Sequence, residues 1–477
     1  MLDQIHQLSL DILAQVGVRI DAPAVAQALA DRGITIKGSQ AVFTPDQIDA
    51  ALATVPEQFD LQGRDPAKQI RVGDTTTHYM AAFGAPFILD KGERREAVLT
   101  DYIRFAKWVH MVDQMPINGG LLVQPSDIPA DRYHLILLYA ALLFSDKPLM
   151  GLSGPADQQE EILGLLKIVY GDDALEKGPV MITLGNTTSP LILDKNLLQT
   201  LEVSARYHQP IVVSPGPMAG STGPIDMVAD VALANAEILA AVVCAQAVSP
   251  GTPVIYGLMA QPADMQSCEI DTGSPGAMAA TVLGARLARR YGLPSRGGST
   301  PVAREVSVLS GMESMMKNMA ASTGGIHLII HSAGLLDRFN CVCPEQFLVD
   351  VDGFCRIEYF KSLLNRQDAG ETHQGWLEEI KAVGPGGNFL MSPSTLAQCR
   401  TTPYVPRVKP RVQPGESENQ ALIREAGEVL DRMLDDYRPP VLEPETHKAM
   451  AAYLVECGVP QSIVDDMDRE YQCCCSR

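Results

Sequence analysis

The middle of the chain alternates short apolar runs with longer helical patterns, and this alternation is the feature that most limits the possible folds. Short, nearly all-apolar strands separated by helices are typical of a parallel sheet whose two faces are covered by helices. The predicted strands are Thr77–Phe83, Asn118–Val123, Pro148–Leu152, Val180–Leu184, Ile211–Ser214, Val254–Leu258, Pro294–Gly298 and His327–His331.

The number of these strand-helix units separates two kinds of parallel α/β fold. The helices predicted between the strands are Asp101–Val112, Tyr133–Phe144, Leu197–Tyr207, Met227–Ala247, Gly276–Arg290 and Ser307–Ser322. Eight strands over a span close to the ~250 residues typical of the fold favour a TIM (β/α)₈ barrel over an open doubly wound sheet. An open sheet would be expected to carry a nucleotide-binding motif, and the sequence has neither G-x-G-x-x-G after a strand nor G-x-x-x-x-G-K-[ST].

Segments outside the predicted barrel divide the chain into three parts. Residues 1–75 are predicted to form an N-terminal helical cap, with helices at Leu8–Val16, Ala24–Arg32 and Thr44–Thr54. Residues 76–400 are predicted to form the barrel, which we expect to be the catalytic domain. Residues 401–477 begin with the proline-spaced connector TTPYVPRVKPRVQP and continue into helices at Glu416–Tyr437 and Glu445–Cys457. We expect these helices to dock on a neighbouring part of the chain or on a second subunit, which predicts a homo-oligomer.

Charge and composition exclude several classes of partner. The formal net charge is -19, with acidic residues dispersed along the chain, which argues against nucleic acid and anionic membranes. The first residues lack the basic and apolar regions of a signal peptide, and the most apolar stretch, Ala232–Val248, is interrupted by polar residues. Ten cysteines without a C-x-x-C pair indicate reduced thiols. We therefore expect a cytoplasmic protein, with Cys473–Cys475 as unstructured or surface thiols.

In a barrel, functional side chains gather where strands end. Phe83, Tyr256 and Phe339 lie where a ring could face the mouth, and their faces would suit a quaternary ammonium group, although core packing is the alternative for each ring. Asn186 could bind substrate or shape a turn. Strand ends also bring two further candidates, each of which has a structural alternative. His331 ends the last strand, and Arg296 could either capture a substrate carboxylate or form an internal ion pair.

The stretch HLIIHSAGLLDRFNCVCPEQFLVD raises the possibility of a metal site. Cys341, Cys343 and His331 could supply three ligands, but residues two apart on an extended chain point in opposite directions. His327, at the start of the strand, is interpreted as a core histidine. We therefore expect buried or loop cysteines and no metal. The strand ends also show no Asp/Glu pair suited to hydrolysis.

Several motifs together resemble the trimethylamine:corrinoid methyltransferase family. They are GLPSRGGSTP, GMES, HLIIHSAGLL, PEQFLVD and VGPGGNFL. Glu313, in GMES, matches an acidic position of the family motif, where it could balance an ammonium charge. Founding members carry pyrrolysine after the strand that ends at His331, whereas this chain has ordinary residues there. After GGNFL the family commonly has His-Thr-Leu, and this chain reads SPSTL, with Ser394.

The resemblance implies a TIM barrel that moves a methyl group from a quaternary amine to the Co(I) of a separate corrinoid protein. Glycine betaine, proline betaine and carnitine are substrates of this kind. The cobalamin belongs to the partner, so no tightly bound cofactor is expected. A quaternary nitrogen leaves as a neutral tertiary amine, which fits the missing acid-base pair. The alternatives are a metal-dependent barrel lyase or hydrolase using Cys341, Cys343 and His331, and a non-catalytic betaine-binding protein.

Overall fold

Eight short strands form the centre of the computed structural model, which describes residues 1–365, 373–401 and 403–476. They are β6 (His78–Ala81), β9 (Asn118–Gly119), β10 (Leu149–Gly151), β11 (Met181–Asn186), β13 (Ile211–Ser214), β14 (Val254–Tyr256), β17 (Arg296–Gly297) and β18 (Leu328–Ala333). Each strand coincides with or overlaps one of the eight predicted runs, so the strand prediction is confirmed.

These strands pair in parallel and neighbour one another in chain order. One sheet has the order β14-β13-β11-β10-β9, and the other has the order β17-β18-β6. A parallel bridge between Tyr256 and Ser295 connects β14 to β17. Beyond the ends of β6 and β9, the backbone N–H of Gly84 donates to the carbonyl oxygen of Leu121 at 2.7 Å. The predicted parallel α/β architecture is therefore confirmed, with ladders inside each sheet and isolated bonds between the two sheets.

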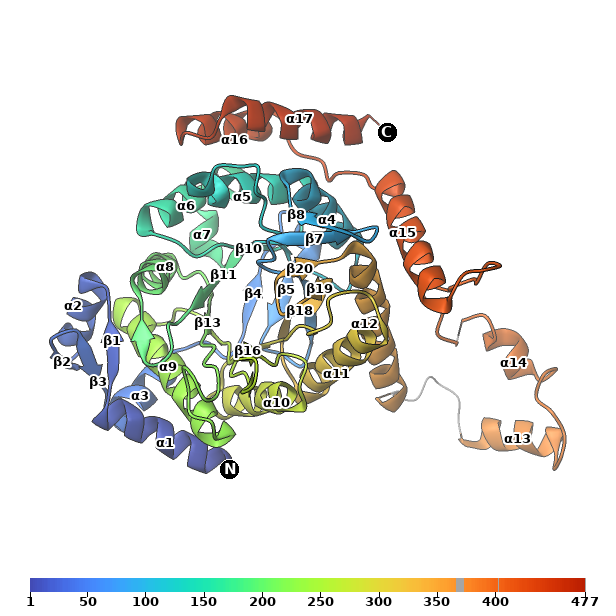
Figure 1. Ribbon diagram of the computed structural model, residues 1–477, viewed down its shortest axis with the longest axis horizontal. Helices are drawn as coiled ribbons and strands as arrows, with labels where there is room; N and C mark the ends of the chain where they lie inside the picture. Colours follow the sequence, from blue (N-terminus) through green and yellow to red (C-terminus); the bar gives the residue numbers. More distant parts are fainter. Residues whose placement is uncertain (366–372, 402, 477) are drawn as a thin grey trace.

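Helices surround the strands and follow them along the chain (Figure 1). They are α4 (Leu99–Met111), α5 (Tyr133–Phe144), α6 (Ala156–Tyr170), α8 (Lys195–Arg206), α9 (Met227–Val248), α10 (Pro275–Arg290), α11 (Val308–Gly324) and α12 (Pro344–Leu364). One described helix, α9, is long and apolar enough to cross a membrane by length and composition, yet 83% of its most apolar window is buried inside the protein. It is a core helix, as its interrupted sequence predicts.

Alternate strand residues fill the space that the strands enclose. This interior cluster contains Met80, Ile117, Met150, Ile182, Leu184, Val212, Ile255, Leu328 and Ile330. The hairpin of β4 (Phe59–Leu61) and β5 (Ile70–Val72) joins the same cluster. It lies at the amino end of β6, where the His78 ring bonds to the carbonyl oxygen of Arg71 at 2.9 Å. Apolar side chains thus occupy the interior up to the carboxyl ends of the strands.

The N-terminal segment contains strands as well as the predicted helices. The helices are α1 (Leu2–Gln15), α2 (Pro23–Asp31) and α3 (Pro45–Leu52), and the strands are β1 (Val18–Ile20), β2 (Thr35–Lys37) and β3 (Gln40–Val42). β1 pairs with β12 (Ile192–Leu193), and the segment shares an apolar core with α9. Each of the three predicted helices overlaps an observed one, whereas the strands between them are not predicted, because strands of three residues are too short to show a periodic pattern.

Small elements surround the carboxyl ends of the central strands. A four-stranded sheet combines β7 (Phe87–Asp90), β8 (Glu93–Glu96), β19 (Leu335–Leu336) and β20 (Cys341–Val342). A hairpin of β15 (Ala263–Asp264) and β16 (Glu269–Ile270) follows β14. Elsewhere, short helices precede β11 (α7, Ala174–Lys177), join β4 to β5 (η1, Pro66–Lys68) and precede α5 (η2, Ala130–Arg132).

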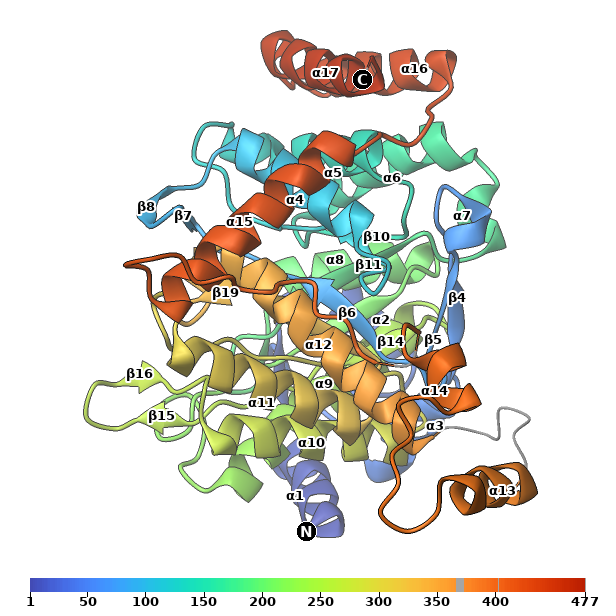
Figure 2. The same cartoon turned by 90° about the vertical axis from the view of Figure 1, so that its right-hand side faces the viewer.

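The last three helices pack on this same chain. α15 (Glu418–Asp436) contacts α4 and α12, while α16 (Pro444–Glu456) and α17 (Gln461–Cys475) lie against α5 and α6 (Figures 1 and 2). Their buried residues Leu430, Met450, Val464 and Met467 belong to the largest apolar core. These helices therefore give no reason of their own to expect a second subunit, and the homo-oligomer stays a prediction.

The cysteine tail is the last turn of a helix. Cys473–Cys475 end α17, so the interpretation of this segment as unstructured is wrong. Cys474 is buried, and its Sγ lies 3.3 Å from the Nζ of Lys107, which donates to it. The other two thiols are exposed. An amphipathic pattern runs from Val464 to Cys474 and carries the helix to the end of the chain.

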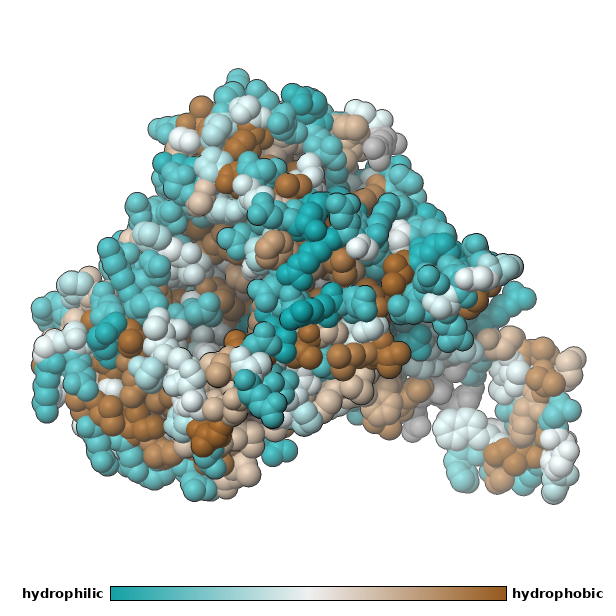
Figure 3. All heavy atoms as spheres, in the orientation of Figure 1, coloured by the Kyte–Doolittle hydropathy of each residue, from teal (hydrophilic) through white to brown (hydrophobic). Residues whose placement is uncertain are grey.

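Between α12 and α15 the chain forms an arm that stands away from the body (Figures 1 and 2). Its helices are α13 (His373–Val383) and α14 (Pro393–Gln398), and its hydrophobic atoms are visible as brown spheres in Figure 3. Ser394 lies on this arm, where its Oγ donates to Oε1 of Glu379 at 2.5 Å. The position at which the family resemblance expects a histidine thus joins α14 to α13.

Candidate active site

A break in the regular ladder of β18 turns the His331 side chain toward the space that the central strands enclose. The register between β18 and β6 shifts between Ile329 and Ala333, and His331 has a φ of +68°. Positive φ is uncommon for residues other than glycine, and bulges of this kind re-aim side chains near active sites. Leu328 and Ile330 face the interior, and without the shift His331 would face the helices.

Arg296 is a buried cation without a carboxylate partner among the described residues. It is 3% exposed, its Nη1 donates to Oγ of Ser214 at 3.1 Å, and its Nη2 lies 3.4 Å from Nε2 of His331. Among the residues that the structure describes, the buried Nε of Arg296 has no hydrogen-bond partner. Burial lowers the pKa of Arg296 to about 9. A buried charge normally has a counter-ion, so this arrangement favours an anionic ligand.

Two aromatic rings flank His331. The ring centroid of Phe339 lies 4.9 Å from that of His331 in an edge-on arrangement, and Phe83 lies 6.5 Å from it with the planes nearly parallel. Both phenylalanines are partly buried. Asp337, Arg338 and Phe339 all have positive φ, so a left-handed turn presents the Phe339 ring. Cationic and aromatic groups thus meet at the carboxyl ends of the strands.

Asn186 and Ser214 end two neighbouring strands at the same level. Their backbones are partners in the ladder of β11 and β13. Ile182 and Leu184 face the interior, so the alternation of β11 places Asn186 on the interior face as well, and its side chain is exposed there. Asn186 therefore stays in the proposed site as an open polar group. Ser214 was missed as a site residue, although its position at a strand end is the signal that could have identified it.

Tyr256 does not lie with these residues. It is fully buried, its hydroxyl donates to Oδ1 of Asn235 on α9 at 2.8 Å, and its ring centroid lies 6.1 Å from that of Tyr291. Ile255 is the interior residue of β14, so Tyr256 points to the layer between the strand and α9. The expectation that its ring faces the mouth is wrong, because strand residues alternate and its neighbour takes the inward position.

Glu313 supports a loop and has no contact with Arg296 or His331 among the described residues. Its Oε2 accepts the backbone N–H groups of Val302 and Ala303 at 2.9 and 3.4 Å. Burial raises the pKa of this carboxyl group. Glu313 thus holds the segment that follows β17, and a direct role in balancing an ammonium charge is not supported by this geometry.

The cysteines near the site are buried thiols. Burial raises the pKa of Cys341 to about 11, and that of Cys343 is raised as well. Cys343 donates to Oε2 of Glu345 at 3.2 Å. Within residues 1–365, 373–401 and 403–476, no group of three or more His, Cys, Asp or Glu residues could hold a metal ion.

The pKa of His331 predicts how acid affects stability. Burial, Arg296 and Lys317 all lower this pKa well below 6.5, so the unfolded state takes up a proton below pH 6.5 while the folded state does not. Stability from this residue is present above that pH and is lost as the pH falls. Between about pH 7.5 and about pH 5.5, the wild type should lose ~1.4 kcal/mol more unfolding free energy than His331→Gln. Urea unfolding at both pH values measures this difference, and equal losses would contradict the assignment.

Parallel strands with polar and aromatic groups at their carboxyl ends are typical of α/β enzymes, which bind small molecules at this end of the strands. Residues 1–456 match the trimethylamine methyltransferase (MTTB) family. The chain is 32% identical to a glycine betaine methyltransferase of Desulfitobacterium hafniense (strain Y51) over 95% of both chains. It is also 27% identical to a proline betaine:corrinoid methyltransferase of Eubacterium limosum over 81% of each.

A third relative is a trimethylamine methyltransferase, MttB, of Methanosarcina barkeri, which is 26% identical over 99% of this chain and 94% of its own length. The chain therefore belongs to the trimethylamine methyltransferase family and is a methyltransferase. This confirms the family resemblance that the sequence motifs carry.

Proposed function

We propose that this methyltransferase demethylates a quaternary amine that carries a carboxylate, such as glycine betaine, proline betaine or carnitine, and passes the methyl group to the Co(I) of a corrinoid protein. The observation that carries the proposal is Arg296, a fully buried guanidinium with no carboxylate partner in the described chain. A zwitterionic substrate would supply the missing anion. The relatives named for glycine betaine and proline betaine support the same class.

The site residues then have complementary roles. Arg296 would bind the carboxylate, with Ser214 fixing the orientation of the guanidinium. His331 is neutral at pH 7, because its pKa is held well below 6.5, and its unpartnered Nδ1 can hydrogen-bond the same ligand. Phe83 and Phe339 would offer their ring faces to the ammonium group. Asn186 completes this proposed set.

The chemical step needs positioning more than proton transfer. The Co(I) of the corrinoid protein attacks one N-methyl carbon in line with the C–N bond, and the nitrogen keeps the electron pair of that bond. The amine leaves as a neutral tertiary amine, so no proton is required. Holding the carboxylate at Arg296 would fix the direction of the N-methyl groups and convert the encounter into an oriented reaction.

Several broader expectations accompany this proposal. We propose that the eight strands act as one (β/α)₈ barrel, supported by their parallel pairing and their circular order from β6 to β18. The corrinoid protein would approach the carboxyl ends of these strands. We also propose a cytoplasmic location.

An anaerobic assay tests the function. The protein is mixed with a Co(I) corrinoid and one amine at a time, and the absorbance change to methyl-Co(III) is followed. We expect methyl transfer from a betaine and little or none from choline or tetramethylammonium, which lack a carboxylate. Transfer from trimethylamine alone, which has neither a quaternary nitrogen nor a carboxylate, would contradict the proposal. Betaine binding without transfer would favour a binding protein instead.

A further inference from the structure

The strands that carry Arg296 and His331 are tied together by one buried lysine. Lys317 lies on α11, which packs against β18, and is 3% exposed. Its Nζ donates to the carbonyl oxygen of His331 at 2.6 Å and to that of Ser299 at 3.2 Å. Ser299 follows Arg296 by three residues. One ammonium group thus bridges the carboxyl ends of β17 and β18.

The bridge lies where the ordinary ladder is interrupted. The ladder between β17 and β18 ends at the pair of Gly297 and Ile329, and on the other side of β18 the register with β6 shifts between Ile329 and Ala333. On the other strand Gly298 has a φ of +136°, and a Cβ atom there would lie 1.8 Å from the carbonyl oxygen of Ile330. The two backbones therefore pass each other without side chains between them, and Lys317 supplies the bonds that hold their ends.

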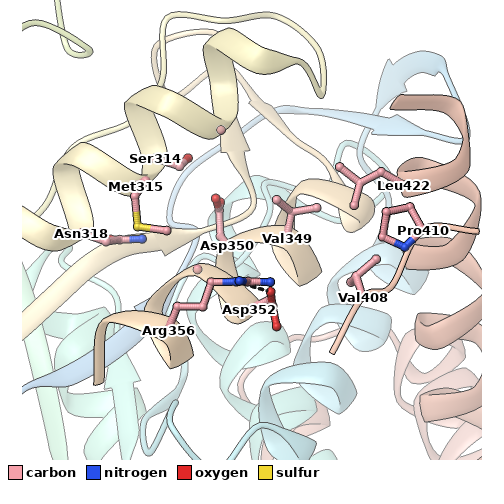
Figure 4. A pocket seen from close by; sticks show the side chains of 12 residues that line it. Ser314, Met315, Asn318, Val349, Asp350, Asp352, Arg356, Val408, Pro410 and Leu422 are labelled. Carbon is pink, nitrogen blue, oxygen red and sulfur yellow. Dashed lines mark hydrogen bonds and ion pairs between the residues drawn. The ribbon is translucent and has the colours of Figure 1, made fainter. Parts of the chain in front are cut away.

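Neighbouring polar side chains hold the rest of the shifted segment. Nδ2 of Asn318 donates to the carbonyl oxygen of Ser332 at 2.9 Å, and Oδ2 of Asp350 accepts the backbone N–H of Gly334 at 2.9 Å. Asn318 and Asp350 line a pocket of about 320 Å³ between α11, α12 and residues 408–422 (Figure 4). The peptide groups after the bulge are thus held from the helix side.

The buried cations Lys317 and Arg296 differ in the charged groups that surround them. Burial lowers the pKa of Lys317 to about 8, while the negative charges of Asp350 and Glu313 act in the opposite direction and favour its charged form. Arg296 has no such carboxylate in the described residues. Lys317 thus has carboxylates of the protein in its surroundings, and its hydrogen bonds go to the two strand ends.

We infer that Lys317 is a positioning residue that sets the separation between Arg296 and His331, and thereby the affinity for carboxylate-bearing amines. This inference rests on the proposed function. A ligand that touches both residues requires both at their correct positions, and a misplacement of about 1 Å can cost about a hundredfold in such a site. A ligand without a carboxylate makes no demand on this pair.

Lys317→Met tests the inference in the full-length protein, because methionine is similar in length and donates no hydrogen bond. Titration calorimetry measures the binding of glycine betaine and of choline. We expect the affinity for glycine betaine to fall roughly 10- to 100-fold, and the affinity for choline to change less than about threefold. Lys361→Met is the control, because Lys361 bonds to Ser322 and Glu358 away from the site, and both affinities should remain unchanged.

The outcomes separate the inference from the proposed function. If the wild type binds glycine betaine no better than choline, the proposed function fails, whatever Lys317→Met does. If the wild type prefers glycine betaine but folded Lys317→Met keeps that preference, or loses both ligands equally, the positioning role is overturned. If Lys317→Met does not fold, Lys317→Gln, which retains one donor group, replaces it in the same titration. Failure of both variants to fold would also overturn the inference, because Lys317 would then serve the fold itself.

Discussion

Arg296→Gln is expected to lower the affinity for glycine betaine by about a hundredfold or more, which corresponds to roughly 3 kcal/mol. Truncating one partner of a buried, hydrogen-bonded charge pair costs about 2–5 kcal/mol of binding energy. In the free protein Arg296 is bonded to Ser214 and lies 3.4 Å from His331, so the guanidinium is already oriented before the ligand arrives. Little ordering cost then offsets the carboxylate interaction.

Arg296 is expected to favour ligand binding but to lower the stability of the unliganded protein. A buried cation without a counter-ion costs free energy in the unliganded protein, and an apolar replacement removes this cost. We therefore expect Arg296→Met to raise the melting temperature of the free protein by about 1–3 °C, while it abolishes detectable betaine binding. Differential scanning calorimetry without and with glycine betaine measures both effects.

A surface arginine provides the control for these variants. Arg206 pairs with Glu160 at 3.0 Å and is 46% exposed. Arg206→Gln should change neither the affinity for glycine betaine nor the melting temperature noticeably, since exposed pairs contribute about 0–1 kcal/mol. A folded Arg296→Gln variant that binds glycine betaine as well as Arg206→Gln does would remove Arg296 from the carboxylate site.

The strands of the fold could be predicted because each is a short apolar run between helical patterns. The same property concealed which residues face the interior. Strands buried on both faces show no alternation between polar and apolar residues, so VIYGL does not reveal whether Ile255 or Tyr256 points inward. In the structure Ile255 faces inward, and Tyr256 bonds to α9. The tyrosine was therefore assigned to the wrong side of its strand.

His331 was expected at the site and lies there, although the regular alternation of its strand would place it on the other face. A regular strand would place His331 with Ile329 on the helix side, and only the register shift turns its ring toward Arg296. Strand-end position was enough to select both residues, but their contact depends on the bulge. Lys317 donates to the carbonyl oxygen of His331 in this bulge, and its place within the methionine-rich pattern GMESMMKNM gives no indication of a bond to a distant strand. Contacts of this kind arise from tertiary packing.

In the proposed function, the charges of the site would explain why a carboxylate matters for a reaction at nitrogen. A quaternary ammonium group gains little from a site that holds a buried guanidinium, because the two positive charges repel in a low-dielectric interior. A betaine places its anion between the two. Arg296 would then attract the ligand through the carboxylate, and the ammonium end would be left to Phe83 and Phe339, the two rings beside His331. Selection against simple tetraalkylammonium ions follows from the same pair of charges.

Trp108→Ala is expected to lower the free energy of unfolding by about 3–5 kcal/mol, the cost typical of removing a buried tryptophan. Trp108 on α4 is fully buried, and its ring contacts Phe105 edge-on at 5.1 Å and Phe347 of α12 at 6.3 Å between ring centroids. Its Nε1 donates to the carbonyl oxygen of Leu430 at 3.1 Å. One side chain thus joins α4, α12 and α15.

The chain offers a matched control, because it has only two tryptophans. Trp376, on the projecting arm, is 43% exposed, and Trp376→Ala should change the unfolding free energy by about 0.5 kcal/mol or less. Urea unfolding followed by far-UV circular dichroism compares the variants, and limited proteolysis should cleave α15 faster in Trp108→Ala only. A loss in Trp376→Ala as large as that in Trp108→Ala would mean that the arm is part of the cooperative core. The contacts around Trp108 would then not be a special source of stability compared with those of the arm.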